Sequence, residues 1–381
     1  MKKVLVTFGT RPEAIKMAPL CRELKSRSER IHMVCCVTGQ HRELLQAVLD
    51  VFHIRPDHDL KVQKDDQDLF HITSSVLERF RDVLLLEKPD LVAVQGDTTS
   101  AFAAALGAFY LKVPVAHVEA GLRSHDRFQP YPEEFNRTAI SHLADLNFCP
   151  TQRAAQNLLN EQIPPHSIHV LGNTVIDALL RTVEVLNLGH EASRYPDELG
   201  LPPGPMILVT GHRRENFGPG LRNLSLSLLD LAEANQDISV VYSVHPNPNV
   251  RAAVEGILGR HERIRIVPPP DYFRFVALMQ KAYLIITDSG GIQEEAPSLK
   301  KPVLVARNVT ERPEAIEAGT ALLVGTDRAR IVREASRLLH DPKHYESMIA
   351  ADNPFGDGRS AVKIADIIER FLDSQLGLSK K

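Results

Sequence analysis

Three acidic side chains in the first half of the chain have the type and placement for proton transfer. Asp97, Glu119 and Glu133 each follow an expected strand. Segments that leave the strands of an open α/β sheet meet at one edge, where ligands bind, so the three carboxylates are expected to converge. Crowded carboxylates raise one another's pKa values and supply a proton donor and acceptor near neutral pH. Taken singly, each also reads as a helix cap or surface acid. Glu119 fits that alternative least, because an apolar strand runs directly into it.

Two cations stand at an expected strand-to-helix turn near the N-terminus. Val4–Phe8 is typical of a buried strand, Gly9 interrupts it, and Pro12 suits the first turn of a helix. Arg11 and Lys16 therefore lie where backbone N–H groups and the helix dipole favour an anion. The alternative is an ordinary turn with solvated charges. The pattern favours a site for a phosphorylated ligand.

A second turn of this kind follows the apolar segment Leu284–Thr287. Ser289 can cap the next helix, and Gly290 and Gly291 let backbone N–H groups approach a diphosphate closely. Glu295, one turn further along, could reach ribose hydroxyls. A tight packing turn with a capping serine is the alternative. The acidic residues on the following helix make the diphosphate interpretation more specific than Ser-Gly-Gly alone.

Histidines and an aromatic segment add further candidates in the second half of the chain. His212, followed by Arg213, and His245 each come after an expected strand. A histidine in such a place is more often a hydrogen-bonding partner than a catalyst, but beside a diphosphate it could help a leaving group depart. The aromatic loop that ends at Phe275 suits clasping a base, or equally a surface loop anchored in the core.

Alternating elements must position all of these groups. Short apolar segments alternate with helical patterns throughout, which predicts α/β architecture with parallel sheets. We expect two Rossmann-like, doubly wound domains facing each other across a cleft. The first spans 1–170, and a loop at Tyr195–Pro205 lies just inside the second. The expected strands are Val4–Phe8, Ile31–Val37, Leu91–Gln95, Pro114–Val118, Leu146–Cys149, Met206–Thr210, Ser239–Val244, Ile264–Val267, Leu284–Thr287 and Val303–Ala306.

Composition narrows the class of protein. The chain has 381 residues, with 43% apolar and 24% charged residues and a net charge of −3, so neither nucleic acid nor a membrane surface is expected as a partner. No segment reads as a signal peptide or a membrane span, and the four cysteines lack metal or redox spacing. We therefore expect a cytoplasmic enzyme with reduced, buried thiols.

Absent motifs narrow the chemistry. The sequence has no Gly-x-Gly-x-x-Gly after a strand, no Gly-x-x-x-x-Gly-Lys-Ser/Thr loop and no His-Glu-x-x-His. Nicotinamide chemistry, kinase-type ATP handling and a zinc-protease site are therefore unsupported. We predict neither a cofactor nor a metal.

Taken together, the motifs resemble those of the non-hydrolysing UDP-N-acetylglucosamine 2-epimerases. The resemblance implies a glycosyltransferase-B-like fold, a homodimer, and conversion of UDP-GlcNAc to UDP-ManNAc for cell-envelope polysaccharide. It also implies a second domain over 171–358 and a last helix, 359–381, that packs back on the first. The matching stretches are Gly9–Pro19, Gly96–Thr99, His117–Arg123, Tyr131–Arg137, Gly211–Phe217, Asp288–Ser298, Thr310–Gly319 and Asn353–Gly358.

The resemblance also implies residue roles. Asp97, Glu119 and Glu133 are similar to the acid/base group of that family, without indicating which of them removes the C2 proton. The other residues with implied roles are Arg11, Lys16, His212 and Arg213 at the diphosphate and catalytic cleft, His245 and Arg312 at the substrate, Ser289, Gly290 and Gly291 at the phosphates, Glu295 at the ribose, and Phe275 at the uracil.

One departure from the family pattern concerns activation. Some relatives bind a second UDP-GlcNAc as an activator, and Gln40, His41 and His245 match that candidate allosteric site. Glu43 and Asp66, however, stand where those relatives carry glutamine and arginine. An acid in place of a cation repels a diphosphate, so we expect weak activation or none.

Three rival functions are less consistent with the sequence. A glycosyltransferase of the same architecture needs an acceptor and gives no reason for three carboxylates around one sugar. A hydrolysing epimerase, which releases free ManNAc, departs from the Arg11-Pro12 pattern. A UDP-sugar sensor without turnover has no use for acid/base carboxylates, and all three are present.

Overall fold

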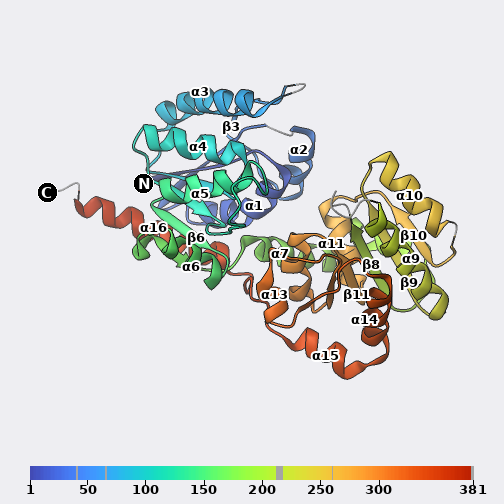
Figure 1. The fold of residues 1–381 in the computed structure, drawn as a ribbon. Coiled ribbons are helices and arrows are strands. Elements are labelled where there is room, and N and C mark those ends of the chain that lie inside the picture. Colours follow the sequence, from blue (N-terminus) through green and yellow to red (C-terminus); the bar gives the residue numbers. More distant parts are fainter. Residues whose placement is uncertain (40–41, 65–66, 212–217, 260, 379–381) are drawn as a thin grey trace. The chain divides into compact units, whose positions relative to one another are not determined.

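The computed structural model describes residues 1–39, 42–64, 67–211, 218–259 and 261–378 (Figure 1). The chain divides into two compact units. Unit 1 comprises Met1–Ala178 and Phe355–Lys381, and unit 2 comprises Leu179–Pro354. Within the described ranges, no helix has the length and apolar character needed to cross a membrane.

Unit 1 is built on a parallel sheet with the strand order β3-β2-β1-β4-β5-β6-β7 among its described residues. Helices connect the strands, as parallel pairing requires. The elements are β1 (Lys2–Phe8), α1 (Arg11–Ser26), β2 (Ile31–Val37), α2 (Arg42–Val51), β3 (His58–Asp59), α3 (Leu69–Glu87), β4 (Leu91–Gln95), α4 (Thr99–Tyr110), β5 (Val115–Val118), α5 (Glu133–Leu143), β6 (Leu146–Cys149), α6 (Gln152–Asn160), η1 (Pro165–Ser167), β7 (Ile168–Val170) and α16 (Ser360–Leu378).

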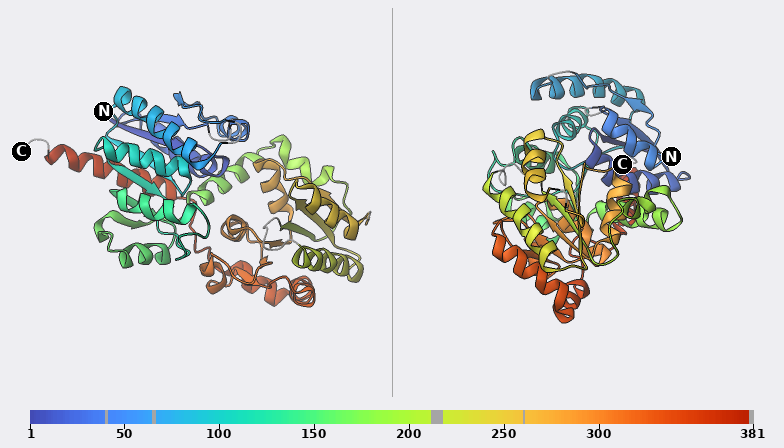
Figure 2. Two further views of the ribbon diagram at one scale, coloured as in Figure 1. Left: turned by 45° about the horizontal axis from the view of Figure 1, so that its top comes forward. Right: turned by 90° about the vertical axis from the view of Figure 1, so that its right-hand side faces the viewer.

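Apolar packing holds the sheet of unit 1 in place. β1, β4 and β5 are buried over most of their length, and α3 and α4 lie side by side against them (Figures 1 and 2). Phe80 of α3, which is fully buried, joins this cluster. Complete burial of one such side chain stabilises the folded state by roughly 1.5–3 kcal/mol, so this packing holds the strands and the turns that follow them in place.

Unit 2 repeats the arrangement with the strand order β10-β9-β8-β11-β12-β13, again parallel. Its helices α9 and α14 pack together over one buried cluster. The elements are η2 (Glu191–Arg194), α8 (Tyr195–Glu198), β8 (Met206–Gly211), α9 (Pro219–Ala234), β9 (Ser239–Val244), α10 (Pro248–Leu258), β10 (Ile264–Val267), α11 (Tyr272–Lys281), β11 (Leu284–Thr287), α12 (Gly290–Glu295), η4 (Ala296–Leu299), β12 (Val303–Val305), α13 (Pro313–Glu317), β13 (Ala321–Leu323), α14 (Arg328–His340) and α15 (Pro342–Ala350).

Two crossing segments connect the units. Helix α7 (Thr174–Asn187) contains the first division, and the second follows Pro354. The returning chain forms α16, which packs on α1 through ion pairs of Arg27 with Asp366 at 2.7 Å and with Glu369 at 3.0 Å. The C-terminal helix is therefore part of unit 1.

Strand order places the switch point of each sheet beside the predicted site residues. In unit 1 the order reverses between β1 and β4, and in unit 2 between β8 and β11. Ligands of open α/β sheets bind outside the carboxyl ends of such strand pairs. The turns after β1, β4 and β11 carry Arg11, Asp97 and Ser289 respectively.

The structure confirms the predicted α/β class with parallel sheets, and the predicted strands agree closely with the observed ones. Three short edge strands, β3, β7 and β13, were not predicted. The prediction of a loop over Tyr195–Pro205 is wrong in its first part, because Tyr195–Glu198 forms the helical turn α8. Pro196 is the second residue of this turn, where its missing N–H leaves no hydrogen bond broken.

Candidate active site

Glu119 is the most tightly held of the three predicted carboxylates. It follows β5 directly, and its φ of +67° places it in the left-handed region that a non-glycine residue seldom adopts. The Lys16 ammonium donates to Oε1 at 2.7 Å and to Oε2 at 2.6 Å. The Asn173 side-chain amide donates to Oε2 at 2.6 Å. With its side chain only 8% exposed, the carboxylate is held by an ion pair and an amide in a partly desolvated place.

Asp97 lies at the end of the neighbouring strand β4. The Arg137 guanidinium contacts its carboxylate at 2.6 Å, and the Asn136 amide donates to its backbone carbonyl at 3.0 Å. Burial raises the pKa of Asp97 above its ordinary value, Arg137 opposes that shift, and the negative charges of Glu119 and Glu133 add to it. Burial therefore favours the protonated form of Asp97.

Glu133 begins α5 and completes the group that the structure brings together. Its charge acts on Asp97, as do those of Glu119 and Lys16. The next residue, Glu134, is buried and contacts Arg137 at 3.4 Å while accepting from the Ser124 N–H at 3.0 Å. Glu134 thus helps to hold Arg137, the partner of Asp97, in place. Glu133, in contrast, is partly exposed.

His117 packs beneath these carboxylates, two residues before Glu119. It is fully buried, and its Nε2 lies 2.7 Å from the Gly96 carbonyl oxygen. The Ser141 hydroxyl lies 3.3 Å from its Nδ1. Burial lowers the pKa of His117 to about 4, so the ring is neutral near pH 7. It ties the turn before Asp97 to helix α5.

The turn after β1 differs from the expected anion site. The buried Glu13 carboxylate accepts from the backbone N–H of Gly9 at 3.1 Å and of Thr10 at 2.8 Å. The Thr98 hydroxyl donates to its other oxygen at 2.8 Å. These two amides are therefore satisfied by the protein itself, and a phosphate site formed by Arg11 and Lys16 at this turn stays a prediction. Arg11 is exposed at the start of α1.

The turn after β11 keeps the predicted glycines at the start of α12. Ser289 occupies the N-cap position, but its hydroxyl makes no capping hydrogen bond, so the predicted capping role is wrong. Its backbone N–H donates instead to the Thr287 hydroxyl at 2.9 Å. A methyl group added to Gly290 would lie 3.7 Å from the Arg312 Cζ, which is ordinary van der Waals contact. The Arg312 cation therefore lies beside Gly290.

Acidic side chains of α12 hold the groups around this turn. Arg312 forms an ion pair with the buried Glu294. The Tyr272 hydroxyl donates to Glu295 Oε2 at 3.1 Å, and Glu295 Oε1 faces Gly291, where an added methyl group would lie 3.7 Å away. Burial raises the pKa of Tyr272 well above its ordinary value, with the Glu295 charge adding to the shift. Tyr272 thus keeps its proton, donates a hydrogen bond and fixes one oxygen of Glu295.

The remaining candidates divide between described and undescribed residues. His245 is exposed after β9, and its Nδ1 accepts from the Asn247 N–H at 3.2 Å. The prediction of a loop that ends at Phe275 is wrong in its last part, because Asp271 caps α11 and Tyr272–Lys281 is helical; Phe275 is half-buried on this helix. Gln40, His41, Asp66, His212 and Arg213, together with the side chain of Glu43, lie outside the described residues.

A pocket of about 300 Å³ lies elsewhere on unit 2, near the ends of β12 and β13, and contains none of the predicted site residues. Across the described parts of the chain, no group of three His, Cys, Asp or Glu side chains has a metal-binding arrangement. The pocket is lined by Asn223, Arg307, Asn308, Leu323, Val324, Gly325, Thr326, Asp327 and Arg330.

Sequence reasoning missed several partners of the predicted residues. Asn173 lies 54 positions from Glu119, and Tyr272 lies 23 positions from Glu295. Arg137 falls within a family motif but had no assigned role. No local pattern indicates these pairings because each depends on strand order; only the proximity of Asn173 to the domain boundary could have drawn attention to it.

Comparison with known proteins places the chain in a family. The family model described as UDP-N-acetylglucosamine 2-epimerase matches residues 22–369. The UDP-N-acetylglucosamine 2-epimerase of Salmonella typhimurium is 52% identical over 374 residues, covering 97% of this chain and 99% of the relative. That of Escherichia coli strain K12 is 51% identical, covering 96% and 98% respectively.

Solved structures agree with the sequence matches. The crystal structure of UDP-GlcNAc 2-epimerase from Neisseria meningitidis bound to UDP-GlcNAc has a TM-score of 0.89 and 45% identity, covering 97% of this chain and all 100% of that one. Two parallel α/β units with this similarity confirm the predicted glycosyltransferase-B-like class. This chain belongs to the UDP-N-acetylglucosamine 2-epimerase family.

Proposed function

We propose that this chain interconverts UDP-GlcNAc and UDP-ManNAc by inversion at C2, without hydrolysis to free ManNAc. Family membership supports the substrate class. The observation that carries the chemistry is the contact of Glu119 with the Lys16 ammonium, together with the charges of Glu119, Glu133 and Lys16 that act on Asp97. Carboxylates in different electrostatic surroundings suit proton removal and delivery at one carbon.

Proton NMR of the purified protein with UDP-GlcNAc alone tests this activity. We expect UDP-ManNAc to appear until equilibrium, with no added nucleotide cofactor or metal. A strict need for added NAD would contradict the proposal, as would free ManNAc as the main product. A sample that lacks the protein controls for spontaneous change.

The carboxylates of unit 1 differ in a way that suggests a division of work. Glu119 faces the Lys16 ammonium, which stabilises its negative charge and so favours the ionised form, the form that can accept a proton. Burial raises the pKa of Asp97, which suits it to hold and deliver a proton. Glu133 modulates this pair through its charge and completes the group. Lys16 thus has two proposed roles: it stabilises the Glu119 carboxylate and contributes positive charge near the substrate.

Most of the proposed contacts to the diphosphate and nucleoside come from unit 2, and Arg11 adds one from unit 1. Gly290 and Gly291 have room for a methyl group, so the fold itself gives no packing reason for glycine there. A ligand that approaches the backbone closely supplies that reason. Arg312 adds positive charge beside Gly290, Glu295 is placed to bind ribose hydroxyls, and Phe275 to contact the base. His212, Arg213, Ser289, Arg11 and His245 keep their proposed diphosphate and substrate roles.

Ligands reported for relatives support this assignment. The Neisseria meningitidis enzyme was solved with UDP-GlcNAc bound. The Methanocaldococcus jannaschii enzyme, which is 34% identical with a TM-score of 0.78, was solved with UDP-GlcNAc and UDP. A uridine diphosphate sugar is therefore the first ligand to test with this chain.

Elimination and re-addition of UDP is the proposed mechanism. A carboxylate takes the C2 proton, the C–H electron pair forms the C1–C2 double bond, and the C1–O bond breaks with its electrons leaving on UDP. Cations stabilise the departing diphosphate beside the bound 2-acetamidoglucal. UDP then attacks C1 again while a proton is delivered to the opposite face of C2, which inverts that centre.

Oxygen-18 placed in the C1–O–P bridge tests whether that bond breaks. We expect the label to scramble to a non-bridging position of the diphosphate during turnover. Inversion without scrambling would contradict elimination. Release of UDP and 2-acetamidoglucal by a carboxylate variant would identify the intermediate, because elimination proceeds while re-addition stalls.

Activation by a second UDP-GlcNAc is proposed to be weak. The basis is the acidic pair Glu43 and Asp66 noted in the sequence. Initial velocity should follow a hyperbola in substrate concentration. Strong sigmoidicity, or an absolute need for UDP-GlcNAc when UDP-ManNAc is the starting material, would overturn this part.

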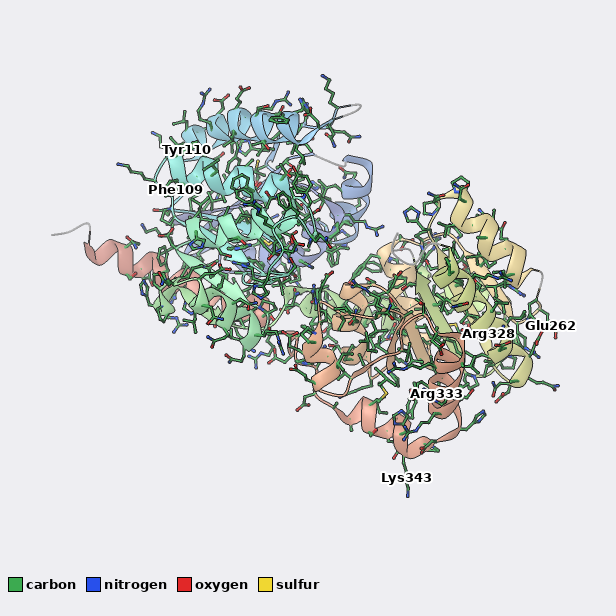
Figure 3. The ribbon with its side chains drawn as sticks, in the orientation of Figure 1. Phe109, Tyr110, Glu262, Arg328, Arg333 and Lys343 are labelled. Atoms are coloured by element: carbon green, nitrogen blue, oxygen red, sulfur yellow. The ribbon has the colours of Figure 1, made fainter. Side chains whose placement is uncertain are left out.

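A homodimer is proposed through the outer face of unit 1. Large apolar side chains are exposed there, including Phe109 at 53% and Tyr110 at 66% on the last turn of α4 (Figure 3), Phe135 on α5 and Phe70 on α3. Large apolar side chains exposed on neighbouring helices favour an interface between proteins. Light scattering should give twice the chain mass, and the double variant F109S/Y110S should shift it toward the monomer. An unshifted mass would assign the interface elsewhere.

We also propose that the enzyme acts in the cytoplasm and supplies ManNAc-derived units for cell-envelope polysaccharide. Its UDP-sugar substrate supports both parts. Deletion of the coding sequence in the source cell should deplete UDP-ManNAc in cytoplasmic extracts and alter the envelope polysaccharide. Unchanged amounts of both would contradict this role.

A further inference from the structure

We propose that Asn173, at the start of the helix that leaves unit 1, is a positioning residue for the Glu119 carboxylate. Its side-chain amide donates from Nδ2 to Glu119 Oε2 at 2.6 Å. The role rests on the proposed function, since it acts through proton transfer by Glu119. It adds to that function a residue outside the acid/base group and a link between the crossing chain and the chemistry.

The orientation of the Asn173 amide is fixed by its two ends. Oδ1 accepts from the Val175 N–H at 3.1 Å at the start of α7, which leaves Nδ2 to face Glu119. Asn173 is only 2% exposed, so rotation of the amide would strand both groups in a buried place. The side chain therefore presents a hydrogen-bond donor, and never an acceptor, to the carboxylate.

The backbone of Asn173 is fixed by the returning chain. Its N–H donates to the Phe355 carbonyl at 2.7 Å. Gly172, with φ +87°, packs so closely that an added methyl group would lie 2.9 Å from the Gly356 Cα. Asp177 accepts from the backbone N–H of Ala361 at 2.8 Å and thereby ties α7 to α16. Asn173 therefore stands at the meeting point of both crossing segments.

Glu119 has particular need of such a support. Its left-handed backbone conformation is unfavourable for a residue with a side chain and persists only where the surroundings hold it. Lys16 contacts both carboxylate oxygens and neutralises their charge, whereas the amide contacts one oxygen from one direction. The amide thus sets the rotation of the carboxylate, and Lys16 sets its ionisation.

Asn173→Asp is the most informative variant. It keeps the size of the side chain and the acceptor for the Val175 N–H, but it replaces the donor by a second carboxylate. We expect kcat to fall by about tenfold to a hundredfold with KM for UDP-GlcNAc nearly unchanged. As pH falls from 8 to 6, the paired carboxyls take up one proton and the donor returns, so the N173D rate should recover relative to wild type.

Two further variants separate positioning from structural support. Asn173→Ala should lose a similar part of kcat without the recovery at low pH, since alanine cannot donate at any pH. Asp177→Asn weakens the tie between α7 and α16 but leaves the Glu119 contacts in place. It should lower the melting temperature while kcat and KM stay within about twofold of wild type.

The outcomes distinguish this inference from the proposed function. An inactive wild type overturns both. An active wild type with N173D turnover near normal, or with kcat lost equally at pH 6 and pH 8, overturns the positioning role alone. A kcat loss in D177N as large as that in N173D would also overturn it, because loosening of the crossing would then suffice.

Discussion

The turns after β1 and β11 look alike in sequence but differ in what occupies them. At the β1 turn, the Glu13 carboxylate takes the N–H groups of Gly9 and Thr10, and a methyl group on Gly9 would lie 2.1 Å from the Thr38 hydroxyl. At the β11 turn, Gly290 has ordinary clearance and Arg312 stands beside it. The fold therefore requires glycine at position 9, whereas packing alone would allow a larger side chain at Gly290.

This difference separates two uses of one motif. A glycine between strand and helix is compatible with close packing as well as with close approach of a ligand. The test is what a methyl group would meet. In unit 1 it meets the protein, so that turn holds the strand ends that carry the acid/base group. In unit 2 it meets nothing closer than 3.7 Å, which favours an anion as the reason for glycine.

The largest expected effect is on turnover, through substitution of the carboxylates in unit 1. Asp97→Asn and Glu119→Gln keep the size of each side chain but remove its capacity for proton transfer. We expect kcat to fall on the order of 10²–10⁴-fold in each, measured by proton NMR. Glu87→Gln, which alters a carboxylate paired with Lys3, serves as the control. Near-normal turnover in both site variants would remove Asp97 and Glu119 from these roles.

Gly290→Ala tests the turn after β11, where the fold leaves room for a methyl group. Because the fold has room for the methyl group, folding stability should be unchanged, whereas UDP should bind about tenfold to a hundredfold more weakly through lost contact with the backbone. Titration calorimetry with UDP and a thermal melt provide the two readings. Unweakened UDP binding in a folded G290A variant would remove the diphosphate from this turn.

Gly9→Ala should show the reverse pattern. The added methyl group collides with the buried Thr38 and Ser100 side chains, so unfolding should become easier by about 1–3 kcal/mol. Denaturant unfolding measures this change. If the variant folds as stably as wild type but loses UDP binding, the two turns are equivalent and the comparison between them fails.

His117 extends the comparison to pH. Its pKa is lowered by burial to about 4 in the folded protein, against an ordinary value near 6.5. The unfolded chain therefore takes up a proton that the folded chain refuses, and stability present above pH 6.5 is lost as pH falls toward 4. At pH 5 this loss amounts to roughly 2 kcal/mol.

Denaturant unfolding of His117→Gln between pH 7 and pH 5 measures this contribution. The variant should lose less stability than wild type over that range, whatever its stability at pH 7. His32→Gln, which alters an exposed histidine of β2, should follow the wild-type slope. Equal slopes for H117Q and wild type would show that His117 titrates normally in the folded protein.

The smallest effect is expected at a glycine with no ligand and no close neighbour. Gly256 lies within α10, and a methyl group there would meet nothing within 4 Å. Gly256→Ala should raise stability by about 0.5–1 kcal/mol through helix propensity and leave UDP binding unchanged. A loss of UDP binding in G256A would mean that the effect of G290A is not local to its turn.

Much of the fold could be predicted from sequence because its central strands are long and apolar. Edge strands such as β3, a two-residue strand of His58 and Asp59, have no such pattern and exist only through pairing with β2. The convergence of Asp97, Glu119 and Glu133 could also be predicted, since it follows from sheet topology. The hydrogen bonds of Glu13 to the backbone of the β1 turn could not be predicted. A glutamate in the third position of a helix is equally consistent with a cap and with a surface acid.

Exchange of the C2 hydrogen with solvent tests the central claim most directly. The claim is that a carboxylate removes this proton and that another is delivered to the opposite face. Proton NMR of UDP-GlcNAc turned over in D₂O should show UDP-ManNAc whose C2 signal is lost to deuterium. UDP-ManNAc that forms at the normal rate and keeps its original C2 hydrogen would contradict the account.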